Sequence, residues 1–473
     1  MVGEITKKGC GMPRLQEVGE WIEDALPDLL AEHEVPAASV AVMLNGEVFA
    51  TAHGLLSKAT GVEATSEAVF QIGSITKLWT TSLAMQLVDE GELGLDEPVR
   101  AYLPDFRLAD EHASAAITIR QLMTHTAGFG GDVFTDTGYG DDCVAKYVAS
   151  LGGQDQLFPP GEYCSYNNAG FVVLGRIVEV LRGKGFDQCL KEHLIGPLKL
   201  THAAIGPYEA ILHRAAVGHV RFDEEQEPEP TSVWALQRST SPAGSMFAMS
   251  ASDLMVFAKM HFDGGFAPDG ERLLSEQATH AMQETQVTLP RIGTCDQARG
   301  LGWAIYNLDG GGQVIGHDGG TIGQGAFFRM VPERNLAIAV RANGGNMGNV
   351  GQEIYARVLR DLAGLETPPE AVPDPAATTP DTSRFAGKYS SEAEDNVVRV
   401  DEDGRVFIDS VPKGISAELG GQPETIEMLP YSGSALISAK RYFGSHFVTA
   451  FLAEDEGRTR YMYDGRIARR VSE

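Results

Sequence analysis

The chain has 473 residues, 43 % of them hydrophobic, and a formal net charge of -27 at pH 7. This length is sufficient for a large core and for more than one domain. The strong negative charge argues against nucleic acid and against an anionic membrane surface as partners.

The N-terminal segment predicts a cytoplasmic protein. Its first ten residues have no apolar stretch after their charges, so they lack the features of a secretory signal. No run in the chain approaches the ~20 apolar residues of a membrane span. The cysteines are odd in number, scattered and without a Cys-x-x-Cys pair, which is typical of reduced thiols; they are Cys10, Cys143, Cys164, Cys189 and Cys295.

The first predicted elements are a helix and a hairpin. Residues 15–34 have the apolar spacing of an amphipathic helix that ends at Val35 and Pro36. Two apolar stretches, residues 38–44 and 47–51, are separated only by Asn45 and Gly46. That dipeptide favours the tight turn of a β-hairpin.

A hydroxyl and an amine follow at the start of the next helix. Ser74 and Lys77 are three residues apart, so a helix places them on the same side. Residues 78–88 are apolar almost all round, which predicts a buried helix. At its mouth, Ser74 would lie near unpaired backbone N–H groups that favour an oxyanion. A desolvated Lys77 would favour its neutral form and could help to take the serine proton.

Taken alone, this pair has simpler interpretations. Ser74 could be only a helix cap, and Lys77 only a solvated helix lysine. The same spacing recurs at Ser410 and Lys413, where Pro412 argues against a helix. The pair therefore needs further elements before it indicates catalysis.

The second element lies in a mixed, mostly helical stretch, residues 102–199. Tyr166 and Asn168 form a Tyr-x-Asn motif there, although each could also be an ordinary core or turn residue. Cys164 lies close by, and we expect an inert buried thiol. His125, within a Thr-His-Thr turn, is expected to be structural.

The third element is a glycine-rich run among predicted strands. Residues 316–321 contain His317, Gly319 and Gly320 and predict the edge of a strand with little side-chain bulk. Further predicted strands are residues 302–307, 326–331 and 336–342, and predicted helices are residues 250–262 and 351–362. This order fits a sheet built from both chain ends with a helical insertion between them.

The C-terminal part has a different pattern. Residues 367–383 are rich in proline and predict an extended, semi-rigid linker. Residues 384–473 contain successive short strand patterns, which predict a small antiparallel barrel. We expect few contacts to cross such a boundary.

Together, the three motifs resemble those of the penicillin-recognising serine hydrolases, a group that includes class C β-lactamases, D-alanyl-D-alanine carboxypeptidases, D-aminopeptidases and esterases. The stretches 122–128, 241–246 and 300–303 resemble the same family, and the resemblance covers roughly residues 13–366. His317 stands where a lysine would be expected, which is similar to the D-aminopeptidase and esterase branch. The implied fold is α/β (an α+β sandwich), with a β-lactamase/transpeptidase-like antiparallel sheet, flanking helices and a helical insertion.

The resemblance also implies roles for the first two motifs. Ser74 would be the acylated nucleophile, with Lys77 as its proton-handling neighbour. Tyr166 would act as general base for acylation and relay a proton to the leaving group. Asn168 would orient the substrate amide and Lys77.

For the third motif, the resemblance implies substrate binding. The backbone N–H groups of Ser74 and Gly320 would form the oxyanion hole, and Gly319 would let substrate approach the strand. His317 could bind a carboxylate when charged, or donate one hydrogen bond. Without the lysine, strong recognition of a penicillin is not expected.

The sequence thus predicts a serine hydrolase that acts through an acyl-enzyme on an amide, in a small or D-residue-containing peptide, or on an ester. An acyltransferase with the same acyl-enzyme is an alternative, as is a weakly catalytic scaffold for binding or assembly. The predicted partner is a small-molecule or peptide substrate, without a metal or cofactor, and a homo-oligomer is compatible with the family. The barrel resembles lipocalin-like appended domains, which could shape the substrate mouth, mediate assembly or add stability.

Overall fold

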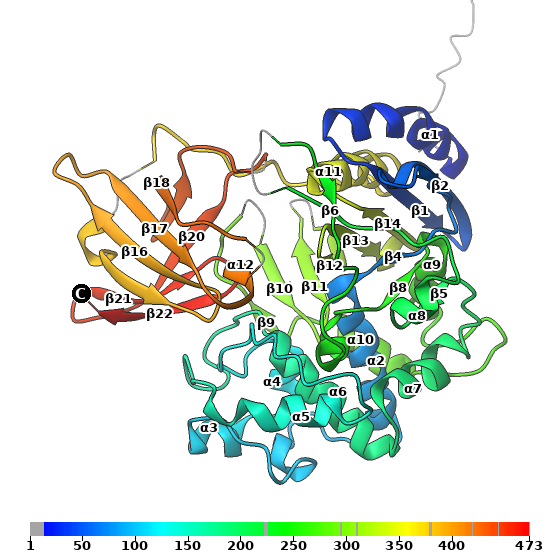
Figure 1. Ribbon diagram of the computed structural model, residues 1–473, viewed down its shortest axis with the longest axis horizontal. Helices are drawn as coiled ribbons and strands as arrows, with labels where there is room; N and C mark the ends of the chain where they lie inside the picture. The colour runs from blue at the N-terminus through cyan, green and yellow to red at the C-terminus, as the bar shows by residue number, and fades with distance from the viewer. Residues whose placement is uncertain are drawn as a thin grey trace, which may run out of the picture.

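The computed structural model describes residues 14–221, 226–293, 296–308, 311–377, 381–418, 420–442 and 444–472. Figure 1 shows two parts side by side. The larger part, a sheet with helices, we call the N-terminal region (residues 14–366), and the smaller part we call the barrel (residues 387–472). Cys10, Cys295 and the N-terminal segment before residue 14 lie outside the described residues. None of the helices in the described ranges combines the length and apolar content needed to cross a membrane.

The large sheet is antiparallel and takes its strands from both ends of the N-terminal region, as predicted. Ala38, near the start of the region, pairs with Ala342, near its end. The predicted hairpin is confirmed, because Asn45 and Gly46 both have positive φ, 51° and 87°. Within the described residues the order is β3 (Val62–Glu63), β2 (Glu47–Ser57), β1 (Ala37–Leu44), β14 (Leu336–Ala342), β13 (Gln324–Val331), β12 (Gln313–Thr321), β11 (Ala304–Asn307), β10 (Asp296–Arg299) and β9 (Val287–Thr288).

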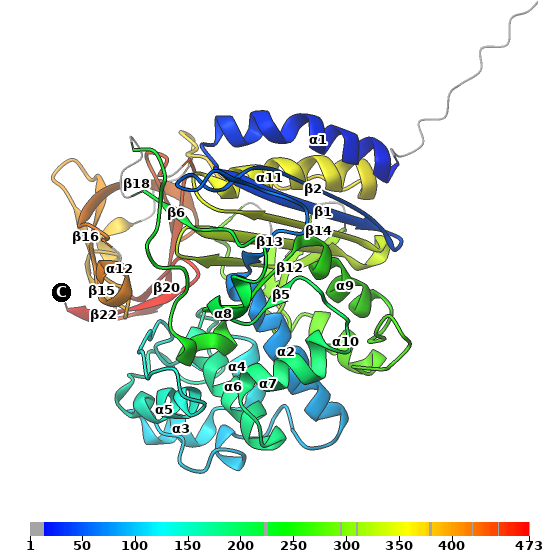
Figure 2. The same cartoon turned by 45° about the vertical axis from the view of Figure 1, so that its right-hand side comes forward.

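Helices cover both faces of this sheet, so β1, β13 and β14 are buried almost throughout. Figure 2 shows α1 (Leu15–Glu32) and α11 (Met347–Val358) together on one face. On the other face lie α2 (Thr76–Asp89) and α9 (Ala251–Phe262). The end of α1 comes earlier than predicted because Glu34 takes a positive φ of 54°, which a helix cannot include.

Between the first and last strands of the sheet, the chain forms a helical insertion, as predicted, which lies at the lower end of the molecule in Figure 1. The third motif follows it in the chain, and the second motif lies within it. Its helices are α3 (Glu111–Ala116), α4 (Ile119–Met123), α5 (Cys143–Ser150), α6 (Asn168–Arg182) and α7 (Phe186–Leu190). The other short elements of this region are α8 (Pro207–Ala210), α10 (Glu276–Gln283), β4 (Phe70–Gln71), β5 (Ala203–Ala204), β6 (His219–Val220), β7 (Glu229–Pro230) and β8 (Ala248–Met249).

The predicted barrel is confirmed and is closed by pairing of its first and last strands. Three of its strands, residues 387–390, 424–432 and 467–472, lack a continuous apolar alternation in the sequence. In chain order, the described elements are β15 (Gly387–Ser390), β16 (Glu394–Val400), β17 (Val406–Pro412), α12 (Gly414–Glu418), β18 (Glu424–Ser432), β19 (Ala435–Ser438), β20 (Val448–Asp455), β21 (Arg458–Tyr463) and β22 (Ile467–Ser472).

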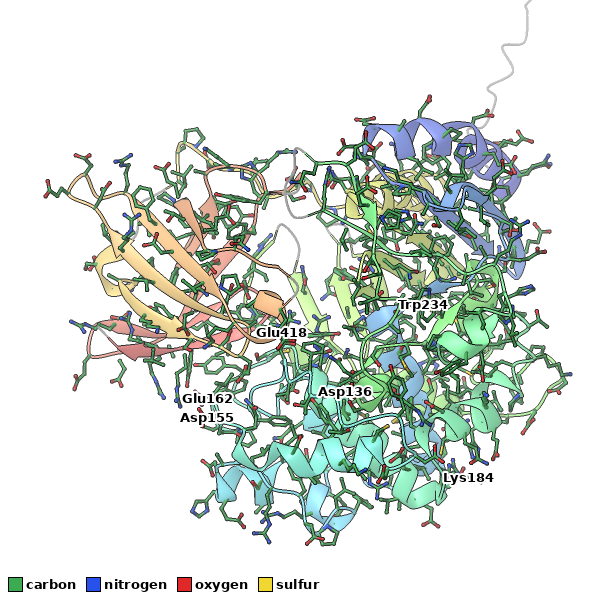
Figure 3. The ribbon with its side chains drawn as sticks, viewed as in Figure 1. Asp136, Asp155, Glu162, Lys184, Trp234 and Glu418 are labelled. Carbon is green, nitrogen blue, oxygen red and sulfur yellow. The ribbon has the colours of Figure 1, made fainter. Side chains whose placement is uncertain are left out.

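The two parts contact each other through an apolar cluster and several hydrogen bonds, which is more than we expected at a boundary of this composition. Figure 3 shows Asp155 and Glu162 of the helical insertion beside the barrel. An apolar cluster joins Phe158 of the insertion to Tyr461 and Ile467 of the barrel. The linker composition could not reveal this interface, because the side chains that form it are distant from the linker in the sequence.

Close packing of glycines brings β12 against the chain just before α2. That chain forms the short turn η1 (Gly73–Ile75). A Cβ added to Gly319 would lie 2.9 Å from the backbone nitrogen of Ser74, and one added to Gly73 would lie 2.6 Å from that of Gly320. Because glycine has no Cβ, the two backbones can lie in direct contact. The N–H groups of Ser74 and Gly320 are therefore neighbours.

The glycine-rich end of β12 also has a free edge, as predicted. On one side β12 pairs with β13 through Thr321. On the other, within the described residues, it pairs with β11 only between Gln313 and Gly316. Beyond Gly316, the backbone of β12 therefore has no strand partner on that side among the described residues.

Removal of the barrel tests the interface. We expect a chain that ends at Val372 to melt at a lower temperature than the full chain, because Phe158 and its apolar neighbours lose their cover. Thermal unfolding followed by circular dichroism measures this difference. Equal melting temperatures for the two chains would show that the barrel does not stabilise the N-terminal region.

The glycine contact gives a second prediction with a matched control. Gly319→Ala would place a Cβ 1.9 Å from the carbonyl oxygen of Ile72, so we expect a destabilisation of about 1–3 kcal/mol. Gly320→Ala meets no atom within 4 Å, and its stability should stay within about 0.5 kcal/mol of the native chain. Urea unfolding of both variants provides the measurement. Equal losses in the two variants would contradict the close approach.

Candidate active site

The three motifs meet at one place, where α2, α6 and β12 converge. Lys77 extends from the first turn of α2, and its Nζ lies 2.9 Å from Oγ of Ser74. The same Nζ donates to Oδ1 of Asn168 at 2.7 Å and to the carbonyl oxygen of Ala243 at 2.7 Å. The helix is buried as predicted, and Lys77 itself has no exposed surface. The fold therefore brings together residues that are far apart in the sequence.

Tyr166 completes this cluster at the start of α6. The Nζ of Lys77 lies 4.9 Å from the centre of the Tyr166 ring. Burial raises the pKa of Tyr166 to about 12, although its hydrogen bond with Ser74 acts in the opposite direction. The phenol is therefore protonated at neutral pH.

The charge of Lys77 is strongly disfavoured. Burial lowers the pKa of its amine well below the ordinary value, and the positive charge of Arg466 lowers it further. The carboxylate of Asp132 acts in the opposite direction. The balance favours a neutral amine beside Ser74.

His317 lies in the wall of the site, with its ring centre 6.0 Å from that of Tyr166. Burial, followed by the charge of Lys77, lowers the pKa of His317 well below its ordinary value. Its Nδ1 lies 2.6 Å from the carbonyl oxygen of Asp318. Because a carbonyl oxygen only accepts, Nδ1 carries the proton and Nε2 is left as an acceptor. Nε2 is buried and has no hydrogen-bond partner among the described residues.

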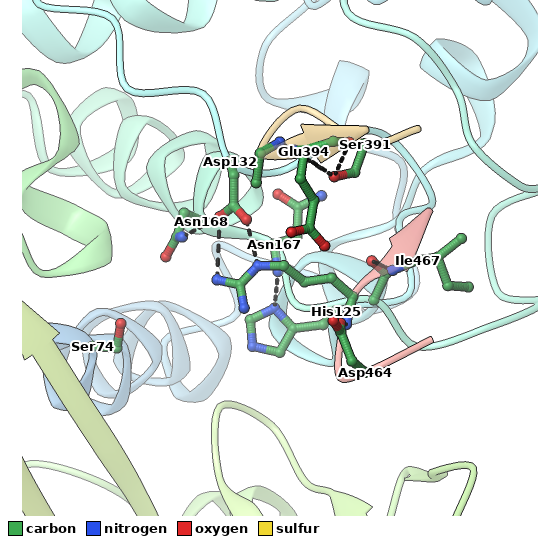
Figure 4. A network of polar contacts seen from close by, with 12 residues as sticks. Ser74, His125, Asp132, Asn167, Asn168, Ser391, Glu394, Asp464 and Ile467 are labelled. Carbon is green, nitrogen blue, oxygen red and sulfur yellow. Dashed lines mark hydrogen bonds and ion pairs between the residues drawn. The ribbon is translucent and has the colours of Figure 1, made fainter. Parts of the chain in front are cut away.

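Two residues of the site had no sequence signal, Asp132 and Arg466. Figure 4 shows Asp132 beside Asn168 in a network of polar contacts. Nδ2 of Asn168 donates to Oδ1 of Asp132 at 2.7 Å. Arg466 donates from Nε to Oδ2 of Asp132 and from a terminal nitrogen to Oδ1 at 3.3 Å. Arg466 belongs to the turn between β21 and β22, so the barrel contributes directly to the site.

Arg299, at the end of β10, was also missed. Its positive charge lowers the pKa of His125 and His317, after burial has done so more strongly. The same charge lowers the pKa of Tyr166, against the larger effect of burial. A lone arginine at a strand end has no distinguishing pattern, so only the fold reveals this charge.

The neighbouring residues agree with the expected structural roles. Nδ1 of His125 accepts a hydrogen bond from the backbone of Asn167 at 3.0 Å, in a buried position. Burial raises the pKa of the Cys164 thiol to about 11, which makes it unreactive. Ser410 lies in β17, on the barrel, where its hydroxyl donates to Glu394.

A group of potential metal ligands lies elsewhere, between α1 and α11. Glu32, His33 and Glu353 could bring three ligand atoms within 4.8 Å of one another. Both carboxylates are exposed, and Nε2 of His33 already contacts Glu353 at 2.7 Å. Exposed acidic groups of this kind are common without an ion, so this cluster does not indicate a metal site.

Comparisons with known proteins agree with this geometry. The Beta-lactamase family model matches residues 22–362. Penicillin-binding protein 4 of Amycolatopsis lactamdurans is 40 % identical over 368 residues, which are 77 % of this chain and 95 % of that protein. The crystal structure of SurE superposes with a TM-score of 0.78 at 27 % identity, over 96 % of this chain and 99 % of that chain. The class C beta-lactamase of Rhodobacter sphaeroides, at 21 % identity and a TM-score of 0.58, shares the fold over 72 % of this chain and 99 % of its own. The chain belongs to the beta-lactamase family of serine hydrolases.

Proposed function

We propose that this protein cleaves an amide, in a small or D-residue-containing peptide, or an ester, through an acyl-enzyme on Ser74. The observation that carries the proposal is the position of Nζ of Lys77, which lies between Oγ of Ser74 and two carbonyl-type acceptors. A nucleophile and a base within hydrogen-bond reach are the first requirement of covalent catalysis.

The hydrogen bonds of Lys77 support its role as the base. A neutral amine has two N–H groups and one lone pair. Asn168 and Ala243 offer only acceptor oxygens, so they take the two N–H groups. The lone pair is then directed at Ser74, whose hydroxyl can donate to it. This arrangement agrees with the lowered pKa of Lys77.

The reaction follows from these positions. Oγ of Ser74 attacks the substrate carbonyl while its proton passes to Lys77, and the N–H groups of Ser74 and Gly320 stabilise the oxyanion. Tyr166, protonated in the free site, donates to the leaving nitrogen or oxygen and is reprotonated from Lys77. The leaving group departs, and water then attacks the acyl-enzyme. The same residues take a proton from the water and return one to Oγ of Ser74, which releases the acid product. The proposal departs here from the expected role of Tyr166 as general base for acylation. Because the raised pKa of Tyr166 keeps its phenol protonated, we assign the first proton acceptance to Lys77 and only the relay to Tyr166.

The chemistry of His317 favours a peptide-like amide over an anionic β-lactam. A neutral imidazole carries no positive charge to pair with the carboxylate of an anionic β-lactam. The crystal structure of SurE with D-Leu covers 96 % of this chain at 25 % identity. That relative supports a D-residue in the substrate, as the His-x-Gly form of the third motif also suggests. A homo-oligomer stays a prediction.

The first test of this proposal is covalent labelling. A fluorophosphonate probe should add its mass to a peptide containing Ser74, as measured by mass spectrometry. We expect Ser74→Ala to abolish the adduct, whereas Ser410→Ala, the matched Ser-x-x-Lys control, should label normally. An adduct on Ser410, or normal turnover in Ser74→Ala, would contradict the assignment.

The same intact-mass assay separates the alternatives. Incubation with a D-amino-acid amide, an activated ester and a penicillin identifies which class acylates Ser74. Release of the free acid indicates a hydrolase, and transfer to an added amine indicates an acyltransferase. A permanent adduct with no released product, together with concentration-dependent assembly, indicates the scaffold.

The second test concerns Lys77 and Tyr166 as one proton-transfer unit. Each of Lys77→Ala and Tyr166→Phe should lower kcat by about 10²–10⁴-fold, and the double variant should fall little further. In the native chain, activity should fall as pH drops through the lowered pKa of Lys77, since the protonated amine cannot accept from Ser74. Steady-state kinetics with the best substrate across pH measures both effects. Multiplicative losses would show that the two residues act independently.

A further inference from the structure

The barrel reaches the proton-transfer residues through an unbroken chain of side chains. Arg466 pairs with Asp132, Asp132 accepts from Asn168, and Asn168 accepts from Lys77. We propose that Arg466 is a positioning residue, through which the barrel holds Asp132 and Asn168 so that Lys77 is presented to Ser74 in its proton-accepting state. This inference rests on the proposed function and assigns the barrel a part in catalysis.

The first step is the orientation of the Asn168 amide. An amide side chain can present either its oxygen or its nitrogen to a neighbour. Asp132 is an acceptor when ionised, so it selects the Nδ2 of Asn168. Oδ1 of Asn168 is then directed at Nζ of Lys77, 2.7 Å away. Asp132 therefore decides which acceptor Lys77 meets.

The second step is the charge of Asp132. Its side chain is only 9 % exposed, and an unpaired carboxylate in such a position is costly. The guanidinium of Arg466 neutralises it with two contacts, one to each oxygen. Without Arg466, the unpaired carboxylate would favour the protonated, positively charged form of Lys77. A charged Lys77 could not take the proton of Ser74.

The third step is that the turn holds Arg466 in place. The residues on either side of Arg466 make backbone hydrogen bonds that anchor this turn. Gly465 accepts a hydrogen bond from the backbone N–H of Tyr166 at 3.0 Å. The backbone N–H of Ile467 donates to Oγ of Ser165 at 3.0 Å. The turn is thus attached on both sides of Arg466 to the chain that carries the second motif. The guanidinium lies over the ring of Tyr166, 5.0 Å from its centre.

Several charged or titratable groups surround Lys77, from every element that packs around the site. Besides Asp132 and Arg466, they are Tyr166 just before α6, His125 from the turn after α4 and His317 on β12. Arg299 on β10 acts on the two histidines, and Asp464 acts on Arg466. The two histidines are buried and neutral, because burial lowers the pKa of each. Removal of Arg466 takes away a positive charge near Lys77, and removal of Asp132 takes away a negative one. The two removals should therefore shift the pKa of Lys77 in opposite directions.

The experiment uses the full-length chain and the rate of Ser74 labelling by the fluorophosphonate probe as a function of pH. We call the part of the pH profile in which the rate falls with decreasing pH the acid limb. Arg466→Ala leaves Asp132 unpaired, so the acid limb should move to higher pH by about 0.5–1 unit. Asp132→Asn removes the negative charge, so the limb should move to lower pH. Both variants should label about 10–100-fold more slowly at their optimum, since Asn168 is no longer held.

Two further variants separate positioning from stability. Arg469→Ala removes the same charge from β22 and a contact of 3.3 Å with the backbone of Gln156, outside the chain to Lys77. It should keep the native pH profile and rate. Arg466→Lys keeps the charge without the two-pronged contact, so it should keep the native acid limb with a reduced rate. It also remains informative if Arg466→Ala does not fold.

Shifts of the acid limb in the same direction for Arg466→Ala and Asp132→Asn, or no shift in either, would overturn the inference. A loss in Arg469→Ala equal to that in Arg466→Ala would overturn it as well, since the effect would then belong to the interface as a whole. Failure of the native chain to label at Ser74 would instead refute the proposed function.

Discussion

The burial of one amine governs the arrangement of the site. Lys77 has no exposed surface, so it depends on the protein for every hydrogen bond. Asn168, Ala243 and Ser74 meet that requirement from three separate parts of the chain. Because a buried charge would be costly without a close anion, the same burial favours the neutral amine that proton transfer requires.

This requirement explains why distant segments must meet at α2. The carbonyl oxygen of Ala243 comes from one of the stretches that resemble the family, and it is an acceptor that does not depend on the side chain. Asn168 comes from the start of α6, where the side chain of Asn167 caps the helix by accepting from Gly170. The helix start thus places Asn168 toward Lys77. Local helix chemistry and the geometry of the site are linked at this point.

The barrel adds an electrostatic contribution to this framework. Its turn between β21 and β22 introduces a cation next to Asp132, and the apolar cluster around Phe158 and Tyr461 keeps the two parts together. A barrel joined only by a linker could not hold a guanidinium in place. The apolar cluster and the position of Arg466 are therefore parts of one arrangement.

The sequence alone determined the three motifs, the antiparallel sheet from both chain ends, the helical insertion and the barrel. These features arise from local spacing: the turn at Asn45 and Gly46, the apolar stretch after Lys77, and the glycine-rich run at Gly319. Only the tertiary structure decided the partners of the motifs. Asp132 and Arg466 are 334 residues apart, and neither lies in a distinctive pattern. The protonation of His317 also depends on burial and on a backbone carbonyl, so it could be determined only once the chain was folded.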